Sequence, residues 1–461
     1  MGEIRPPKAG TETIGGAAME HQYSKDDIRR IVKEEGIRFI RLQFVDIFGM
    51  LKNVAITTEE LDKALADQAM FDGSSIEGFV RIEESDMYLR PDPNTFTILP
   101  WFKDYRIARM ICDIYRPDGT PFEGDPRYVL RKAVAEAKEL GYDFFVGPEC
   151  EFFLFQTDAN GTPTTHTHDE ASYFDLAPID NGEMARIDMV KTLMEMGFKI
   201  EAAHHENAPG QHEIDFKYSD ALRSADNIVT FKLVVKVVAK EFGLHATFMP
   251  KPLSDECGSG MHCNMSLFRD GKNAFYDPEG PQGLSQEAYY FIGGILKHAK
   301  GMTAITNPLI NSYKRIVPGY EAPVYIAWST ANRSPLIRIP VARGVGTRIE
   351  MRNPDPSCNP YLALAAMLKA GLDGIKNKIT PPGPIDRNIY AMTHFDLAQE
   401  GIERLPKDLN AAIKELLADE LVKDALGKHV TDNYVKAKQI EWSDYNRQVH
   451  PWEIDKYLKM Y

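Results

Sequence analysis

The sequence has few cysteines, and no two of them form a Cys-x-x-Cys pair. This argues against zinc-ribbon and thioredoxin-like motifs, and the odd total of five favours reduced thiols over a disulfide framework. Long apolar stretches are also missing, because the longest, residues 361–368, is too short to cross a bilayer. The N-terminal residues lack the apolar centre of a signal peptide. We therefore expect a cytoplasmic protein with no membrane partner.

The two common nucleotide-binding loops are absent as well. The chain contains no Gly-x-x-x-x-Gly-Lys-Ser/Thr motif and no Gly-x-Gly-x-x-Gly motif after a predicted strand. If a nucleotide binds, metal ions and arginines must therefore hold its phosphates. The net charge of −13 argues against nucleic acid or an anionic membrane as the main partner.

Lysine is absent from one long segment in which arginine accumulates. Residues 315–352 contain six arginines and only two acids, Glu321 and Glu350. Forked guanidinium groups bind phosphate and carboxylate through two hydrogen bonds, whereas lysine supplies a point charge. In the last part of the segment polar and apolar residues alternate, so a strand would place Arg348, Glu350 and Arg352 on one face. The segment is predicted to bind an anion, with a carboxylate available to a metal ion.

A turn cluster at residues 117–121 is the predicted domain boundary, because it concentrates proline, glycine and aspartate. Residues 1–22 carry several glycines and two prolines without helical or strand periodicity, and they predict a disordered leader. We expect a small α+β domain at 23–118 and a larger domain at 119–461.

The larger domain is expected to alternate long helices with isolated strands, which is typical of a sheet covered by helices. Asp125 and Pro126 provide an N-cap and a favoured first residue for its first helix. Over the whole chain, we predict helices at 25–35, 61–69, 225–242 and 284–300, strands at 37–48, 51–56, 152–155 and 262–268, and a mostly helical segment from 406 onward.

Two motifs gather carboxylates. Glu149 and Glu151 stand two residues apart where an apolar strand is predicted to begin, so both side chains point to one face. Like charges on a half-buried face repel unless cations neutralise them, although a solvated strand edge explains this pair equally well. Glu206 and Glu213 flank a Pro-Gly turn, beside histidines that either bind metal or pack.

A third motif, Gly258-Ser-Gly-Met-His262, leads into a strand whose alternation places His262, Asn264 and Ser266 on one face. Its glycines permit the backbone to approach a ligand closely. A lone histidine at a strand start is often structural, but the three motifs together offer carboxylates, one imidazole and little sulfur. This donor set suits Mg²⁺ or Mn²⁺ better than structural zinc. With the arginines, these are the components of metal-assisted phosphoryl transfer.

Seven motifs, in order, resemble bacterial class-I glutamine synthetase, in its shorter form without the insertion that is adenylylated. The resemblance runs from about Ser24 to Tyr461. Its motifs are Phe71-Asp-Gly-Ser-Ser75, Pro148-Glu-Cys-Glu151, the segment 205–213, Gly258-Ser-Gly-Met-His262, the segment 311–319, Asn332-Arg-Ser334 and Arg348-Ile-Glu-Met-Arg352.

The resemblance implies ATP-dependent ligation of ammonia to L-glutamate through a γ-glutamyl phosphate, giving glutamine, ADP and phosphate. It implies an α+β fold, with a small β-grasp N-terminal domain and a large catalytic domain whose funnel-shaped antiparallel sheet is covered by helices. It further implies a dodecamer of two hexameric rings with active sites between subunits. Feedback inhibition by glutamine through Arg81 and a nitrogen-regulatory protein partner at the C-terminal tail are implied as well.

The resemblance also implies a role for each chemically active residue. Two groups of three ligands would hold two or more Mg²⁺ or Mn²⁺ ions: Glu151, Glu206 and Glu213 in one group, and Glu149, His262 and Glu350 in the other. The implied glutamate contacts are Cys257, Gly258, Arg315, Glu321, Arg333 and Arg352, and the implied ATP contacts are Glu201, Asn264, Ser266, Arg333, Arg338 and Arg348. The implied catalytic residues are Asp72 from the neighbouring subunit, Glu321 on a closing flap, and Arg333.

Two features leave alternatives open. Cys257 stands where the family usually has asparagine, which puts glutamate affinity in doubt unless that position acts through its backbone. Asp72, taken without the resemblance, is better interpreted as a turn aspartate.

Three competing functions remain: a relative that ligates other amines, a non-catalytic homologue and a metal-dependent hydrolase. The acids Asp72 and Glu321 favour ammonia, the full set of metal carboxylates favours an enzyme, and a hydrolase leaves the arginines unexplained.

Overall fold

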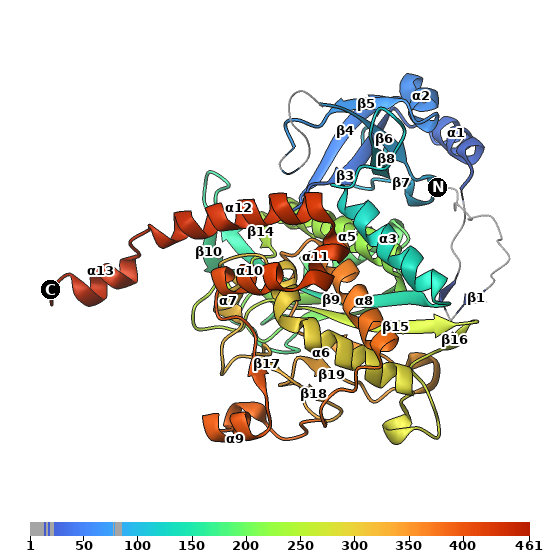
Figure 1. The fold of residues 1–461 in the computed structure, drawn as a ribbon. Helices are drawn as coiled ribbons and strands as arrows, with labels where there is room; N and C mark the ends of the chain where they lie inside the picture. The colour runs from blue at the N-terminus through green and yellow to red at the C-terminus, as the bar shows by residue number, and fades with distance from the viewer. Residues whose placement is uncertain (1–12, 15–16, 19–22, 77, 79–84) are drawn as a thin grey trace.

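The computed structural model describes residues 13–14, 17–18, 23–76, 78 and 85–461, which form a small N-terminal domain and a larger second domain (Figure 1). Arg81 lies outside the described residues, as does most of the leader predicted at 1–22. Within that leader, strands β1 (Thr13–Ile14) and β2 (Ala17–Ala18) pair antiparallel.

The N-terminal domain is a six-stranded sheet that carries two helices. Helix α1 begins at a capping box in which Ser24 and Asp27 bond each other's backbone, and it buries Ile28 and Val32. The strand order is β4-β3-β8-β6-β5, with β7 beside β8, and β3 and β8 run parallel. The elements are α1 (Lys25–Glu34), β3 (Phe39–Val45), β4 (Leu51–Thr57), α2 (Leu61–Leu65), β5 (Ala69–Asp72), β6 (Asp86–Pro91), β7 (Thr97–Ile98) and β8 (Ile107–Tyr115), with short 3₁₀ turns at Thr58–Glu60 and Pro93–Thr95.

The helix predicted at 61–69 is too long. Helix α2 ends at Leu65, because Asp67 adopts a left-handed conformation with φ of 64° and the chain turns there. Residues 69–72 then form strand β5 at the edge of the sheet. The apolar residues of this segment therefore belong partly to a helix and partly to a strand. Their spacing in the sequence did not show where the helix ends.

The larger domain is built on an eleven-stranded curled sheet. Its main path is β11-β12-β9-β15-β20-β19-β18, and all its pairs are antiparallel except β18 with β19. The strands are β9 (Asp143–Thr157), β10 (Pro163–Thr167), β11 (Ile200–His205), β12 (Gln211–Phe216), β13 (Ser219–Asp220), β14 (Leu244–Thr247), β15 (Met261–Arg269), β16 (Lys272–Asn273), β18 (Trp328–Ser329), β19 (Ile337–Arg338) and β20 (Ile349–Met351); β17 (Tyr325–Ile326) pairs separately with β21 (Glu403–Arg404).

Strand β9 is much longer than the strand predicted at 152–155. It begins at Asp143, and its first half buries Phe144 and Val146 before the carboxylates of Glu149 and Glu151. The sequence pattern did not predict one continuous strand, because Glu149 and Glu151 interrupt its run of apolar residues. They consequently lie in the middle of the sheet.

Helices cover the sheet and form the core with it. Helices α3 and α5 pack on β9, and α8 packs on α3, α5 and α6. Helices α6 and α8 approach closely where Gly294 faces Ala370 and Gly374, because a Cβ on Gly294 would lie 2.0 Å from the Ala370 carbonyl oxygen. The helices are α3 (Pro126–Glu139), α4 (Glu183–Glu195), α5 (Ala221–Glu241), α6 (Gln286–Thr306), α7 (Ser312–Arg315), α8 (Pro360–Asn377), α9 (His394–Gln399), α10 (Leu409–Ala418), α11 (Glu420–Leu426), α12 (Lys428–Asn446) and α13 (Pro451–Tyr457), with 3₁₀ turns at Pro281–Gly283, Gly344–Gly346 and Ile389–Ala391.

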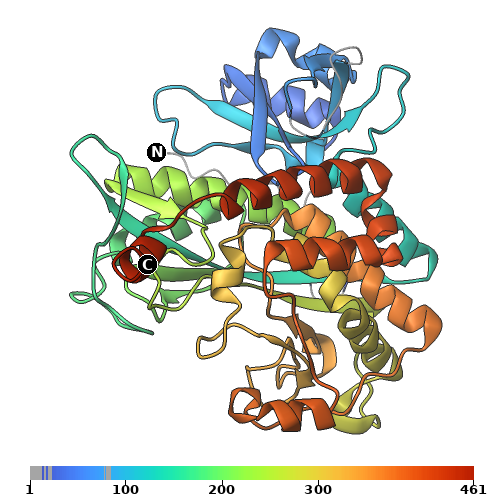
Figure 2. The ribbon, with the colours of Figure 1, turned by 60° about the vertical axis from the view of Figure 1, so that its left-hand side comes forward.

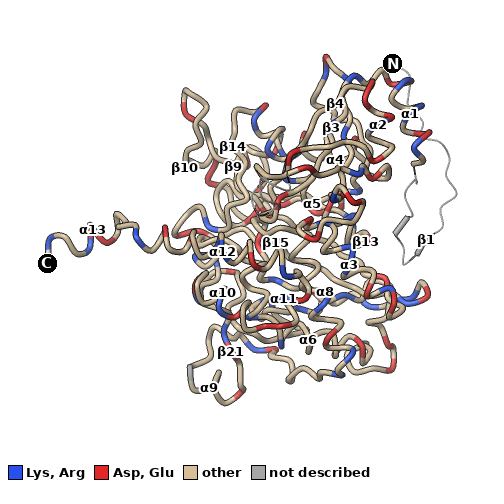
Figure 3. Tube along the Cα trace, turned by 45° about the horizontal axis from the view of Figure 1, so that its top comes forward, with Lys and Arg blue, Asp and Glu red and all other residues tan. Residues whose placement is uncertain are grey.

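The α+β class and the predicted N-cap at Asp125 are confirmed, and the residues after 406 are mostly helical as expected. The helices predicted at 225–242 and 284–300 are present with shifted ends, as α5 and α6. Helix α13 projects from the body beyond α12 in Figure 1, and Figure 2 views the same helix nearly end-on. Acidic and basic residues are interspersed along the trace of both domains (Figure 3).

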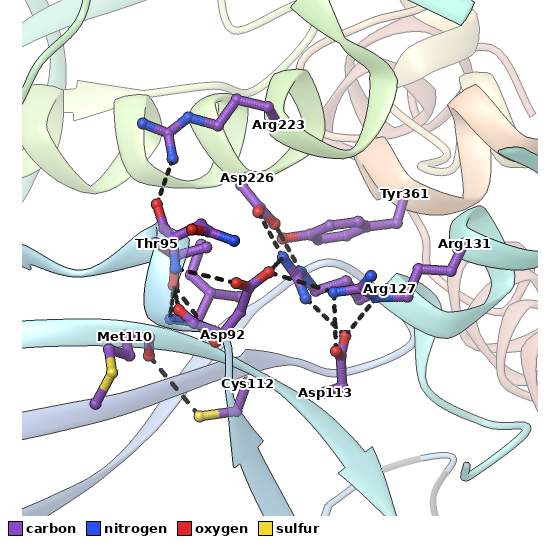
Figure 4. Close-up of polar contacts among 12 residues, drawn as sticks. Asp92, Thr95, Met110, Cys112, Asp113, Arg127, Arg131, Arg223, Asp226 and Tyr361 are labelled. Carbon is purple, nitrogen blue, oxygen red and sulfur yellow. Dashed lines mark hydrogen bonds and ion pairs between the residues drawn. The ribbon is translucent and has the colours of Figure 1, made fainter. Parts of the chain in front are cut away.

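The two domains are joined by a buried ionic network (Figure 4). Arg127, at the start of α3, has a side chain that is 2% exposed and donates to Asp226 of α5 at 2.9 and 3.0 Å. It also donates to Asp113 of β8 at 2.7 Å and to Asp92 at 2.8 Å. The Tyr361 hydroxyl of α8 donates to Asp226 at 2.7 Å. One guanidinium therefore connects the sheet of the small domain to two helices of the large one.

A second junction lies at the β3–β4 hairpin. Asn359 caps helix α8 by accepting from the Tyr361 amide, while its own amide group donates to the carbonyls of Asp46 and Ile47 at 3.2 Å. Gly49, with φ of 80°, permits this approach, because a Cβ there would lie 2.8 Å from the Asn359 Cα. The hairpin of one domain thereby rests on the helix cap of the other.

All five cysteines have free thiols, and four of them are buried. Within the described ranges, none of the helices combines the length and the apolar character needed to span a bilayer.

Candidate functional site

The carboxylates that the sequence singled out meet on one face of the curled sheet. Strand register places Glu213 of β12 opposite Glu151 of β9, and His262 of β15 opposite Glu149 of β9. Farther along the sheet, Asn264 of β15 stands opposite Glu350 of β20. Residues that are up to two hundred positions apart in the chain thus form one continuous row across four strands.

One end of this row is a compact group of Glu149, His262 and Glu350. The His262 Nδ1 lies 3.2 Å from Glu149 Oε2 and 3.8 Å from Glu350 Oε1, and the three possible ligand atoms all lie within 4.8 Å of one another. Burial raises the pKa of Glu149, but hydrogen bonds from His262 and Asn264 outweigh it and bring that pKa to about 2. Burial, with Arg352, lowers the pKa of His262. Ionised carboxylates and a neutral imidazole are the forms that bind a cation.

Glu151, Glu206 and Glu213 form a second, looser group: their carboxylates repel each other, but the three are not among the sets of described residues whose ligand atoms all lie within 4.8 Å of one another. Burial first, and then a neighbouring carboxylate, raise the pKa of Glu206 to about 8 and that of Glu213 well above its usual value. Burial also raises the pKa of Glu151 to about 7. His204 lies 3.6 Å from Glu206 and 3.7 Å from Glu213. A divalent cation among these carboxylates would relieve the repulsion, so the group fits a metal ion.

Gly260 lies close to side chains of both groups. A Cβ at this position would lie 2.6 Å from Arg315 Nη2, 3.0 Å from His262 Nε2 and 3.3 Å from Glu151 Oε1. These distances are shorter than ordinary van der Waals contacts, so a side chain at 260 would displace the arginine, the imidazole or the carboxylate. Glycine therefore permits these three side chains to lie directly against the backbone.

Asp215, which the sequence reasoning missed, joins the same face. Register places it opposite Glu149, and together with His204 and Glu213 it offers ligand atoms within 4.8 Å of one another. Burial and Glu213 raise its pKa to about 9. Its position two residues after Glu213 on a strand was the available signal, because that spacing selects the same face.

Two arginines of the 315–352 segment contact Glu350, and a third lies nearby. This carboxylate is almost fully buried and accepts from Arg338 at 2.8 Å and from Arg352. Arg348 donates to the Asn264 side-chain oxygen at 2.9 Å, and the Asn264 amide donates to Glu149 at 2.9 Å. Arg338, Arg348 and Arg352 therefore lie at the same end of the row as the first group of ligands.

Two arginines of that segment are engaged with the backbone. Arg315 is buried and donates to the carbonyls of Asn353 at 2.8 Å and Arg352 at 3.2 Å, and its Nη2 lies close to Gly260. Arg343 donates to the carbonyls of Gln282 at 2.7 Å and Pro340 at 2.6 Å. Arg343, for which the sequence indicated no chemical role, therefore belongs to the loop structure.

Glu321 is tied to the carboxylate row through Asn207, another residue that the sequence reasoning missed. The Asn207 side-chain amide donates to Glu321 at 3.2 Å, and its backbone amide donates to Glu206 at 3.1 Å. Arg333 is exposed, bonds to the side chain of Tyr173, and through its carbonyl accepts from Arg352 at 3.2 Å. Asn207 therefore links Glu321 to Glu206 of the second group of carboxylates.

Three of the residues predicted to belong to the site have no described hydrogen bond to the two groups of ligands. Asp72 is on β5 of the N-terminal domain, and its described hydrogen bonds both go to Ser74, at 2.8 and 2.6 Å. Those bonds lower the pKa of Asp72, as expected of a turn aspartate. Glu201 is exposed at the start of β11. Ser266 is buried on β15, four residues from His262 on the same face.

A further cluster of His168, Asp169, Asp180 and His212 also brings four possible ligand atoms within 4.8 Å. It does not fit a metal ion, because Arg186 lies 2.7 Å from Asp180 and donates to His212 Nδ1 at 2.8 Å. Arginine only donates, so His212 Nδ1 accepts and the proton of the ring is at Nε2. The nitrogen that faces the cluster is therefore unavailable to a metal.

Cys257 lies where the glutamate site is expected, and its thiol faces the backbone amide of Glu321. The neighbouring Gly258 carbonyl accepts from Gln211 at 3.3 Å. An asparagine oxygen at 257 could accept from the same amide, so Cys257→Asn is expected to leave the KM for glutamate within a few-fold of wild type. Initial rates against glutamate test this, and a large fall in KM on introducing asparagine would contradict it.

Comparisons with known proteins identify a family that matches this chain over most of its length. The glutamine synthetase catalytic-domain model matches residues 123–457, and the glutamine synthetase β-grasp model matches residues 36–117. Glutamine synthetase from Clostridium saccharobutylicum is 63% identical over 441 residues, covering 95% of this chain and 100% of the relative. The enzyme from Thermus thermophilus is 60% identical over 444 residues, with the same coverage.

Solved structures agree. A complex described as GmaS with ADP superimposes with a TM-score of 0.84 at 33% identity, covering 94% of this chain and 99% of that chain. Glutamine synthetase of Plasmodium falciparum gives a TM-score of 0.84 at 27% identity, with the same coverage. The fold expected from the motifs, a small β-grasp domain with a large domain whose curled sheet is covered by helices, is confirmed.

Proposed function

Because this chain belongs to the glutamine synthetase family and is a glutamate–ammonia ligase, we propose that the carboxylate row on its curled sheet carries out the reaction through a γ-glutamyl phosphate. The observation that supports this most directly is that two groups of candidate metal ligands lie next to each other, one of them in contact with arginine side chains. Glu149, His262 and Glu350 lie beside Arg338 and Arg352, and the second carboxylate group adjoins them across β9.

The reaction brings two anions together, because the glutamate γ-carboxylate must attack the terminal phosphate of ATP. In the proposal, Glu151, Glu206 and Glu213 would hold one Mg²⁺ or Mn²⁺ ion, and Glu149, His262 and Glu350 a second. Such ions supply charge neutralisation at the phosphate oxygens. Arginine side chains add preorganised donors where charge develops. Arg315 and Arg352, with Cys257 and Gly258, would hold glutamate; Arg333, Arg338, Arg348, Glu201, Asn264 and Ser266 would hold ATP.

The acyl phosphate must react with ammonia before water reaches it. Glu321 would serve as the flap residue, since Asn207 links it to Glu206 at the edge of the second carboxylate group. In this role its segment excludes water and its carboxylate helps to hold ammonium. Asp72 would remove a proton from that ammonium. Asp72 lies on β5 of the N-terminal domain and bonds locally to Ser74, so the proposal assigns it to the site of a neighbouring subunit and not to the carboxylate row of its own chain.

The enzyme itself is tested by measuring phosphate release from ATP with Mg²⁺ and glutamate. We expect turnover that depends on ammonium, and little turnover when methylamine replaces it. Turnover with methylamine alone would favour a ligase for other amines. Phosphate release that needs neither amine would indicate a hydrolase, and no ammonium-dependent turnover would contradict the proposed chemistry.

We also propose that the chain assembles into a dodecamer of two hexameric rings in the cytoplasm. Apolar side chains are exposed on α13 at Trp452 (64%), directly after it at Leu458 (70%), and near Asp72 at Met70. A projecting apolar helix is a typical subunit contact. The same tail is the proposed contact for a nitrogen-regulatory protein. Glutamine feedback through Arg81 belongs to this proposal, and equal glutamine inhibition of wild type and Arg81→Ala would remove that residue from it.

Truncation after Asn446 tests the role of α13. We expect the truncated chain to form smaller assemblies in sedimentation velocity experiments, because the apolar face of the helix is lost. Replacing the charged Lys456 and Lys459 by alanine should leave the assembly intact, since those side chains do not supply the apolar face. An unchanged sedimentation coefficient after truncation would contradict a role for the tail in assembly.

A further inference from the structure

The turn between β11 and β12 carries Glu206 and leads into the strand that carries Glu213, so its shape affects how these two carboxylates face each other. The Glu206 amide donates to the Gln211 carbonyl at 2.8 Å, and the Gln211 amide donates to the Ala208 carbonyl at 3.0 Å. Gly210, with φ of 67°, lies against β9, because a Cβ there would be 2.8 Å from the Leu154 carbonyl oxygen. The turn is therefore tightly packed.

The Gln211 side chain links this turn to the third carboxylate. It is almost fully buried. Its side-chain oxygen accepts from the Ala208 amide at 3.2 Å, and its side-chain nitrogen donates to Glu151 Oε2 at 3.0 Å and to the Gly258 carbonyl at 3.3 Å. One neutral amide thus connects the turn that holds Glu206, the carboxylate of Glu151 and the start of the glycine motif.

The hydrogen bonds to Glu151 select one of its two oxygens. Oε2 accepts from Gln211 and also from the Gly260 amide, at 2.9 Å. Oε1 lies instead beside Gly260, 4.0 Å from His262 Nε2. Two donors on Oε2 leave Oε1 as the oxygen presented to a cation.

The opposite side of the turn is held by a separate pair. Asp169 accepts from the Gly210 amide at 2.9 Å and lies 3.3 Å from His205 Nε2, while His205 Nδ1 donates to the Glu206 carbonyl at 2.7 Å. The turn is consequently fixed on this side whether or not Gln211 is present. Loss of the Gln211 amide should therefore release the carboxylate of Glu151 more than it disturbs the fold.

We propose that Gln211 is a positioning residue for the Glu151, Glu206 and Glu213 group, and that its amide sets which Glu151 oxygen meets the metal ion. This rests on the proposed function, because it deepens the metal assignment made there. Gln211 acts through Glu151 and the turn. It is not proposed to touch substrate or to ligate the ion itself.

Gln211→Met tests the proposal, since methionine has similar length but offers no hydrogen bond. Free Mn²⁺ is followed by electron paramagnetic resonance while the full-length, metal-free enzyme is titrated. Wild type is expected to show two classes of site. Gln211→Met should weaken one class about 10- to 100-fold, the usual cost of losing a group that orients a ligand, and leave the other unchanged. Ammonium-dependent kcat should recover at saturating Mn²⁺, so the loss appears in the activation constant for the metal.

Glu213→Gln and Glu350→Gln identify the two classes, because each removes a ligand from a different group. Gln43→Met controls for replacing a buried glutamine, since Gln43 lies in β3 of the N-terminal domain. Unchanged Mn²⁺ binding in Gln211→Met, or equal weakening of both classes, would overturn the inference. If wild type binds no Mn²⁺ at all, the metal assignment of the proposed function fails instead.

Discussion

Replacing Arg127 by methionine is expected to lower the free energy of unfolding by about 3–5 kcal/mol, because it leaves the buried carboxylate of Asp226 without its ion-pair partner. Arg127 is 2% exposed and binds Asp92, Asp113 and Asp226. Methionine nearly fills the same volume, so the loss measures the uncompensated charges more than a cavity. Urea unfolding followed by circular dichroism, at fixed protein concentration, gives the change.

Arg131 provides a matched control within the same helix. It contacts Asp92 at 3.3 Å and Asp113 at 2.9 Å, yet its side chain is 38% exposed. Solvent screens such a pair, so Arg131→Met is expected to cost only about 0–1 kcal/mol. Equal losses for the two variants would show that burial of Arg127 does not decide the stability of this junction.

Glu350→Gln is expected to lower kcat/KM by about 10³-fold. A metal ion at a transferring phosphate contributes several kcal/mol, and each 1.36 kcal/mol corresponds to a tenfold change in rate. Glutamine keeps the size of the side chain but loses the charge that holds Arg338 and Arg352 and that would bind the cation. Ammonium-dependent phosphate release over a range of ATP concentrations, at saturating glutamate and ammonium, gives kcat/KM for ATP and measures the effect.

Glu136→Gln is the control for Glu350→Gln, because it shows whether the loss of any carboxylate that is paired with cations lowers activity. Glu136 accepts from Lys369 at 2.6 Å and from Lys376, so it also lies between two cations, but it is on α3 and outside the carboxylate row. Its activity should stay close to wild type. A Glu350→Gln enzyme as active as Glu136→Gln would remove Glu350 from the proposed metal site.

Strand alternation in the sequence predicted which residues share a face, and the structure has them so. His262, Asn264 and Ser266 lie on one face of β15, and the apolar residues between them are buried. Alternation is a local property and needs only the period of a strand. For the same reason it could not find the register that places Glu213 beside Glu151, because that pairing depends on how distant strands align.

The roles of Gln211, Asn207 and Arg343 were beyond the sequence for a related reason. Each acts through hydrogen bonds to partners that are far away in the chain, such as Glu151, Glu321 and the Gln282 carbonyl. Nothing in the residue type reveals such a partner. The length of β9 was not predicted, because Glu149 and Glu151, which are candidate metal ligands, also interrupt the apolar pattern of the strand.

The two junctions between the domains have a mechanical consequence. The Arg127 network and the Asn359 contact with the β3–β4 hairpin hold the small domain at two separated points, so a rotation about either junction is opposed by the contacts of the other. A reaction step that opened the two domains relative to each other would first have to break the ionic bonds of Arg127 or the hydrogen bonds of Asn359.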